Sequence, residues 1–131
     1  MVAVWQIIRN NIQQKTNFEN LLSKEYREIT RRIPYTALVG DELKDDEKCK
    51  AYNEIFNYMD LCNEQIFLRK SGRVRKNTWI NWQEGMKTNF SLPVFENASS
   101  EVFYKLSNNV EELKKVKGSG YNTAPKNWKN V

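Results

Sequence analysis

The segment from Tyr52 to Phe95 constrains the fold of this chain more than any other part of the sequence. It contains a long aromatic-rich run, a glycine, a basic turn, a second run with two tryptophans, and a proline. In both runs the apolar residues recur at spacings of three and four, which places them on one face of an α-helix. Alternating β-branched residues, the signal for a strand, do not extend beyond three positions. The sequence therefore predicts an all-α fold.

The same spacing predicts four helices joined by short connections. Pro34 ends the first helix because the residue before a proline is disfavoured in helical geometry, and Gly72 suits a left-handed cap after the second. Short connections favour antiparallel neighbours, so we expect a mostly antiparallel four-helix bundle with a long first helix. Pro93 is expected in an extended bend. The predicted domain is residues 1–117, with helices at about 4–33, 43–70, 77–90 and 97–117, followed by a flexible tail at 118–131.

Four aromatic residues are predicted to build the core of the bundle. Each lies on an apolar stripe, and tryptophans at helical spacing are more often core residues than platforms on which nucleic-acid bases stack. Gly85 lies within the third predicted helix, where glycine costs about 1 kcal/mol relative to alanine, so a close packing contact is expected there. The predicted aromatic core consists of Tyr26, Phe56, Trp79 and Trp82.

The first half of the first predicted helix has no apolar partner within the domain. Trp5, Ile8 and Ile12 are followed by a polar run, and the stripe that faces the core is expected to begin only at Phe18 and Leu21. A helix that begins this way usually extends toward another molecule. Trp5, Ile8 and Ile12 are therefore the candidate assembly face.

Several kinds of chemistry have no support in this composition. The chain has no histidine, which removes histidine general bases and the usual zinc sites. Cys49 and Cys62 would lie about 20 Å apart on one helix, at about 1.5 Å per residue, so we expect two reduced thiols and a cytosolic compartment. The carboxylates of Glu25, Glu28, Asp60 and Glu64 could form a catalytic pair, but salt bridges to nearby arginines are the more common arrangement. We predict no enzyme, metal, cofactor or small-molecule substrate.

Charge is distributed unevenly along the chain, whose net charge is +5. Cations beside tryptophans can hold phosphates while bases stack, although they can also cap helix ends and keep a turn soluble. Nucleic acid is therefore a possible partner without further support. The candidate patch for an anionic partner consists of Arg69, Lys70, Arg73, Arg75 and Lys76.

Three stretches of the sequence carry a resemblance: YREITRRIPY at 26–35, YMDLCNEQIFLRKSGRVRKNTWINWQEGMK at 58–87, and LPVF at 92–95. They resemble an uncharacterised family of small bacterial proteins with an N-terminal membrane helix and a cytoplasmic all-helical domain. The resemblance covers roughly residues 5–105 and implies no catalytic residue. A weaker similarity is to helical accessory proteins of bacterial RNA-targeting defence systems.

The expected function is a non-enzymatic helical module for interaction or self-assembly. The resemblance implies that it is the cytoplasmic part of a membrane-anchored protein, with Trp5, Arg9 and Lys15 flanking the membrane. A homo-oligomer or a protein partner is expected. The alternative is an accessory factor of an RNA-targeting defence system, which contacts RNA or its effector through the basic patch.

Overall fold

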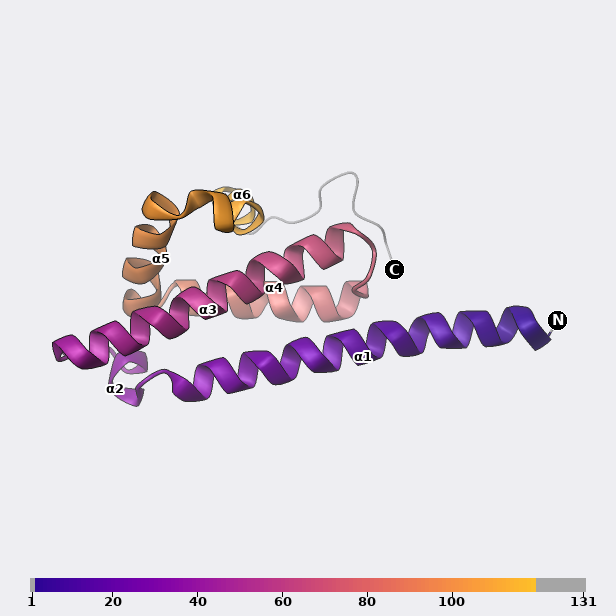
Figure 1. Cartoon of the computed structure of the whole chain (residues 1–131), viewed down its shortest axis with the longest axis horizontal. Helices are drawn as coiled ribbons and strands as arrows, with labels where there is room; N and C mark the ends of the chain where they lie inside the picture. The colour runs from indigo at the N-terminus through magenta and orange to yellow at the C-terminus, as the bar shows by residue number, and fades with distance from the viewer. Residues whose placement is uncertain (1, 120–131) are drawn as a thin grey trace.

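The computed structural model describes the backbone of residues 2–119, and the side chains of Gln6, Asn10 and residues 13–119 (Figure 1). These residues form helices and short connections without a strand, which confirms the all-α class. The predicted tail lies outside the described residues from residue 120 onward. The helices are α1 (Val2–Arg32), α2 (Tyr35–Leu38), α3 (Asp45–Lys70), α4 (Lys76–Phe90), α5 (Pro93–Lys105), the 3₁₀ helix η1 (Ser107–Asn109) and α6 (Glu111–Gly118).

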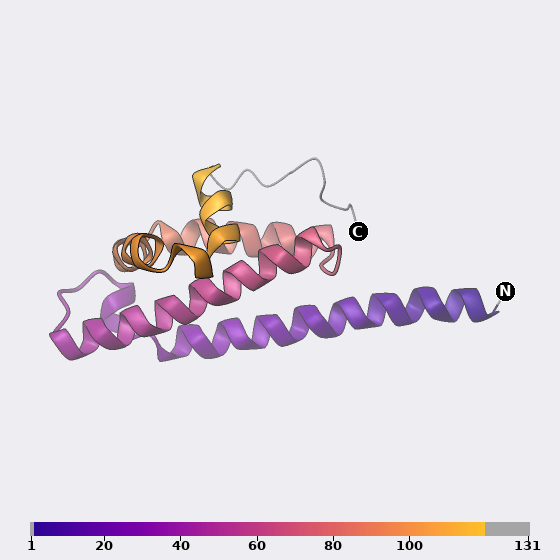
Figure 2. The ribbon, with the colours of Figure 1, turned by 45° about the horizontal axis from the view of Figure 1, so that its top comes forward.

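The three longest helices lie side by side. Figures 1 and 2 show α1 and α4 running in one direction and α3 in the other, whereas α5 crosses them. Helix α6 packs against the C-terminal half of α3. The antiparallel prediction thus fits the long helices only. A four-helix bundle is not what the described residues form, because the predicted fourth helix is two separate helices.

The break between α5 and α6 has a local cause. Ser107, Asn108 and Asn109 have side chains that compete with helical hydrogen bonding, and the chain turns there through η1. The turn lets Val110 and Leu113 become fully buried, while Leu106 stays 43% exposed. The prediction of one continuous helix at about 97–117 was therefore wrong.

A second correction concerns Pro93, which begins α5 instead of lying in an extended bend. Its fixed φ angle and missing N–H suit the first position of a helix, where the N–H has no partner within the helix. The predicted ends at Pro34 and Gly72 are confirmed: α1 ends at Arg32, and Gly72 has a φ of 78°.

Helix α3 lies at the centre of the fold, and α1, α2, α5 and α6 all pack against it. Ile55, Met59 and Ile66 are fully enclosed, whereas Phe67 is 60% exposed. The N-terminus of α6 is capped from α3, since the backbone N–H of Leu113 donates to Asn63 Oδ1 at 3.1 Å. A polar residue in the predicted stripe of α3 thereby holds α6 in place.

The buried stripe of α1 departs from the prediction at Phe18 and Leu21. Leu22, Ile29 and Ile33 are buried, but Leu21 is 64% exposed and Phe18 is 37% exposed. The position on the buried face one turn before Leu22 is taken by Glu19, which is 3% exposed. Sequence reasoning chose the apolar neighbours and missed the acid.

Helix α1 continues beyond the turn that joins α3 to α4, as both ribbon views show (Figures 1 and 2). Gln14 and Lys15 still line a cavity of about 350 Å³ with Gly72 and Arg73 of that turn. We call residues 2–13 of α1 the projecting segment. Its described side chains, those of Gln6, Asn10 and Gln13, are all exposed.

Gly85 does not make the close packing contact expected of it, because a Cβ atom there would meet nothing within 4 Å. We therefore expect Gly85→Ala to stabilise the protein by about 0.5–1 kcal/mol, the difference in helix propensity. The measurement is the free energy of unfolding in urea.

Gly40→Ala is the matched control for Gly85→Ala. Its Cβ would also meet open space, but Gly40 has a φ of 81°. Alanine is strained in that conformation, so this variant should be destabilised by about 1 kcal/mol. A loss of stability in Gly85→Ala would show that a packing contact exists after all.

Candidate functional site

Arg75 of the basic turn is the partner of the buried Glu19. The Arg75 backbone N–H donates to Glu19 Oε1 at 3.0 Å, and the guanidinium Nε donates to Glu19 Oε2 at 3.0 Å. Burial alone would raise the pKa of Glu19, but the hydrogen bonds and charge of Arg75, with a hydrogen bond from Thr78, outweigh it and lower that pKa. The pair fastens α1 to the start of α4.

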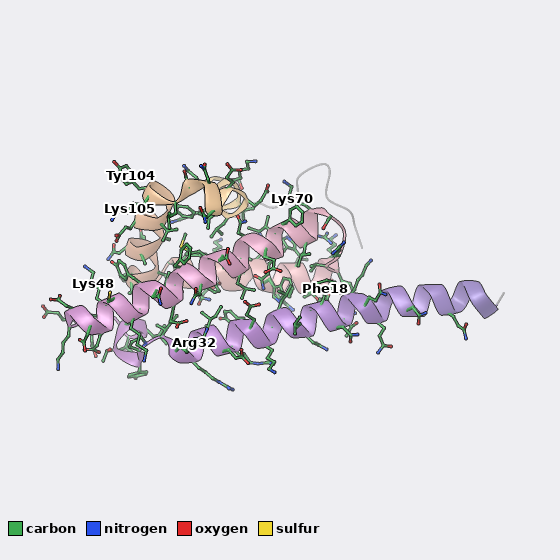
Figure 3. All side chains as sticks on the ribbon, in the orientation of Figure 1. Phe18, Arg32, Lys48, Lys70, Tyr104 and Lys105 are labelled. Carbon is green, nitrogen blue, oxygen red and sulfur yellow. The ribbon has the colours of Figure 1, made fainter. Side chains whose placement is uncertain are left out.

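Two more cations of the predicted patch have structural partners. Arg69 is 3% exposed and donates from Nη1 to the carbonyl of Val74 at 2.7 Å, so it closes the turn from within, and burial lowers its pKa. Lys70 donates to Glu112 Oε2 at 2.8 Å and so links α3 to α6 (Figure 3). The prediction of Arg69 in an exposed patch was wrong, since burial removes it from the surface.

Arg73 and Lys76 remain exposed at the surface of the turn. The Arg73 guanidinium lies over the ring of Phe18, 5.9 Å from its centroid, on the side of α1 that faces the turn (Figure 3). The five basic residues therefore do not form one open patch. Most of their charge holds α1, α3, α4 and α6 together.

The aromatic residues predicted for the core divide into three cases. Trp79 is buried at 2% exposure, whereas Tyr26 and Trp82 are partly buried and pack against the core. Phe56 is half-buried and lines a groove between α3 and α5, so its placement in the core was wrong. A core position on α3 that the prediction lacked belongs to Tyr58, at 2% exposure.

Asn89 joins the three long helices through a single amide group. Its Nδ2 donates to the hydroxyls of Tyr26 and Tyr58, each at 3.1 Å.

Burial raises the pKa of Tyr58 and also that of Cys62, to which the Tyr58 hydroxyl donates. Cys62 is buried and Cys49 is exposed, and both are free thiols as predicted.

The four carboxylates considered for catalysis lie along α1 and α3. Burial raises the pKa of Glu25, and the negative charges of Glu64, Asp60 and Glu28 raise it further. Arg32 pairs instead with Glu54, at 3.0 Å. No carboxylate is among the described residues that line the cavity between α1, α3 and α4. Within the described residues, no group of His, Cys, Asp and Glu could hold a metal ion.

Two further hollows lie among the described residues. A groove of about 570 Å³ lies between α3 and α5, with Tyr52, Phe56 and Val102 along it and Cys49 at its edge. A cavity of about 340 Å³ lies between α1, α3 and α4, and we call it the three-helix cavity. Its lining is Ser23, Tyr26, Arg27, Tyr58, Gln65, Asn81, Trp82 and Gly85.

The side chains of the candidate assembly face, Trp5, Ile8 and Ile12, lie outside those described, although the backbone that carries them is helical. Among the described residues, no helix is long and apolar enough to cross a membrane.

No protein-family model, curated protein or solved structure matches this chain. The family resemblance of the three sequence stretches therefore stays a prediction.

Sequence reasoning missed Glu19 and Asn89, two polar residues that fix the helices in place, and it placed Asn63 on the apolar stripe of α3 without its capping role. The signal for Glu19 was its spacing, three residues before Leu22 and seven before Tyr26 on the same face of α1. Its partner lies 56 residues away and could not be identified from spacing.

Proposed function

We propose that this protein is a non-enzymatic helical module that self-associates through the projecting segment of α1. The observation that carries the proposal is the continuation of α1 past the α3–α4 turn, with apolar residues at regular spacing along it (Figure 1). The partner is a second copy of the chain.

The spacing of those residues matches the buried stripe of α1. Alternating steps of three and four connect the positions of Trp5, Ile8, Ile12, Lys15, Glu19, Leu22, Tyr26, Ile29 and Ile33. From Glu19 onward these residues are buried or packed against the core. This seven-residue repeat is the pattern by which two helices pack as a coiled coil. In the C-terminal half of α1 this stripe faces α3. In the N-terminal half its spacing continues through the apolar residues Trp5, Ile8 and Ile12.

The helical state of the projecting segment also favours a packing partner. Helices of fewer than about 12–15 residues are marginal in water, and most helix stability in proteins comes from packing of an apolar face. The rest of α1 removes the cost of starting a helix but gives the projecting segment no packing surface. A second α1 would supply one.

The test is the mass of the full chain, measured by light scattering over a range of concentrations. We expect a concentration-dependent dimer or larger species, and the variant Ile8→Asp with Ile12→Asp should be monomeric. Burying an isoleucine contributes about 1.5–3 kcal/mol, so losing two should weaken association by about 100-fold or more.

Gln6→Asp with Gln13→Asp is the matched control, because it adds the same charge to exposed positions in the same turns of α1. This variant should associate like the parent chain. A parent chain that stays monomeric at the highest concentration, or equal weakening by both double variants, would contradict the proposal.

A position beside the bacterial membrane is also part of the proposal, and it rests on the family resemblance and on Trp5, Arg9 and Lys15.

The alternative role in RNA-targeting defence has less support. It needs the five basic residues as one open patch, whereas Arg69 is buried and Lys70 and Arg75 are salt-bridged.

A further inference from the structure

The three-helix cavity combines aromatic walls with polar groups from three helices. Tyr26, Tyr58 and Trp82 provide ring surface, and the volume of about 340 Å³ is near the lower end of the range of about 300–1,000 Å³ for ligand pockets. Such a space suits a small, flat molecule. Gly85 adds no side chain on the α4 side, where a Cβ would meet nothing within 4 Å.

Gln65 of α3 presents its amide to this cavity. The residue is 4% exposed, its amide has no hydrogen-bond partner among the described residues, and neither amide atom is among the fully enclosed atoms that lack a partner. The amide therefore reaches the open space of the cavity, where water can hydrogen-bond to it. Because Gln65 lines the cavity, a molecule bound there could supply that hydrogen bond in place of water.

The other polar groups around the cavity are mainly donors. The Tyr26 hydroxyl accepts a hydrogen bond from Asn89, which leaves its own proton available. Arg27 carries a positive charge without an ion pair among the described residues, and Asn81 contributes a further amide. The described lining residues include no carboxylate. Donors and a cation favour a ligand with acceptor oxygens and negative charge.

We propose that the three-helix cavity binds a small planar aromatic carboxylate. Its ring packs between Tyr26, Tyr58 and Trp82, and its carboxylate accepts hydrogen bonds from Gln65 and Arg27. Aromatic pairs with ring centroids about 4.5–7 Å apart gain energy beyond the area they bury. This ligand site does not depend on self-association of α1.

The experiment titrates indole-3-acetate, and neutral indole in parallel, into the full chain while amide NMR signals are recorded. Saturable binding of indole-3-acetate is expected with a Kd of about 1 mM or below, the range in which molecules of this size begin to bind specifically. The signals that move should include the side-chain amides of Gln65 and Asn81. Indole should bind at least about five-fold more weakly, because it lacks the carboxylate.

Three variants test the contacts. Gly85→Leu fills the cavity and should abolish binding, whereas Arg27→Gln and Gln65→Leu should each weaken it by about five-fold. Lys24→Gln is the matched control for Arg27→Gln: it removes an exposed cation of α1 that does not line the cavity, and binding should be unchanged.

Several results would overturn the proposal. These are the absence of saturable binding by either probe, binding that persists in a folded Gly85→Leu variant, and equal affinity for indole and indole-3-acetate. Equal weakening by Lys24→Gln and Arg27→Gln would also overturn it, since the effect would then be one of net charge. Arg27 is exposed, so its variant gives a result even if Gly85→Leu does not fold.

Discussion

Phe95→Ala should destabilise this protein by about 3–5 kcal/mol, the usual range for removing a buried phenylalanine side chain. Phe95 is 1% exposed and sits where α5 crosses the long helices. Its ring meets Tyr58 edge-on, with centroids 5.7 Å apart, and Phe90 edge-on at 6.3 Å. Removing the ring leaves a cavity and ends both aromatic contacts. The measurement is the midpoint of urea unfolding.

Tyr104→Ala is the control for Phe95→Ala, because it truncates another aromatic ring on α5. Tyr104 is 88% exposed at the outer end of that helix (Figure 3), and surface changes of this kind usually stay within about 0.5 kcal/mol. A loss below about 1 kcal/mol for Phe95→Ala would mean that α5 contributes little to the core.

Arg75→Ala is expected to cost about 2–4 kcal/mol, because the Glu19 carboxylate would remain buried without its cation. The Glu19 side chain is only 4% exposed, although Arg75 is partly open to solvent. Lys105→Ala breaks the exposed pair with Glu101 and is the control, with an expected cost of about 0.5 kcal/mol or less. Urea unfolding at neutral pH measures both.

The effect of Arg75→Ala should also depend on pH. The pKa of Glu19 is lowered from an ordinary value of 4.5, so its charged form stabilises the fold above that pH. The contribution is lost as the pH falls through the lowered pKa. Arg75→Ala removes the guanidinium, whereas the backbone N–H of residue 75 and Thr78 still donate to Glu19. Burial then meets less opposition, so the pKa of Glu19 is higher in the variant than in the parent chain. The difference between the two proteins should therefore shrink as the pH falls, first through the higher pKa of Glu19 in the variant and then through the lowered pKa in the parent chain. A constant difference would contradict this account of the pair.

Local signals in the sequence predicted the helical class and several helix ends. Pro34 and Gly72 end helices through the backbone conformations that proline and glycine themselves favour. Their effect on the helix ends therefore depends little on neighbouring residues. Helical spacing was also sufficient to predict the burial of Trp79. The division of the last helix at Ser107–Asn109 had a local cause, but the apolar stripe across it favoured one continuous helix.

The candidate site was harder to predict, because its contacts join residues far apart in the chain. Formal charge marked Arg69 and Arg75 as available cations, whereas the fold uses one to close a turn and the other to neutralise Glu19. The three-helix cavity depends on how α1, α3 and α4 sit together, and no sequence stretch contains it. Gly85 drew attention in the sequence because it lies within a helix. A glycine there is compatible with either a close packing contact or an open space, so the sequence could not distinguish the two.

Helix α1 contains neither glycine nor proline between Val2 and Arg32, and it is one uninterrupted helix. It therefore has no hinge at the point where the projecting segment leaves the rest of the fold. At about 1.5 Å per residue, that segment is a spacer of roughly 20 Å. Whatever it joins would be held at a set distance and rotational angle from the Glu19–Arg75 pair, so an assembly built on it would have a defined geometry instead of a tethered one.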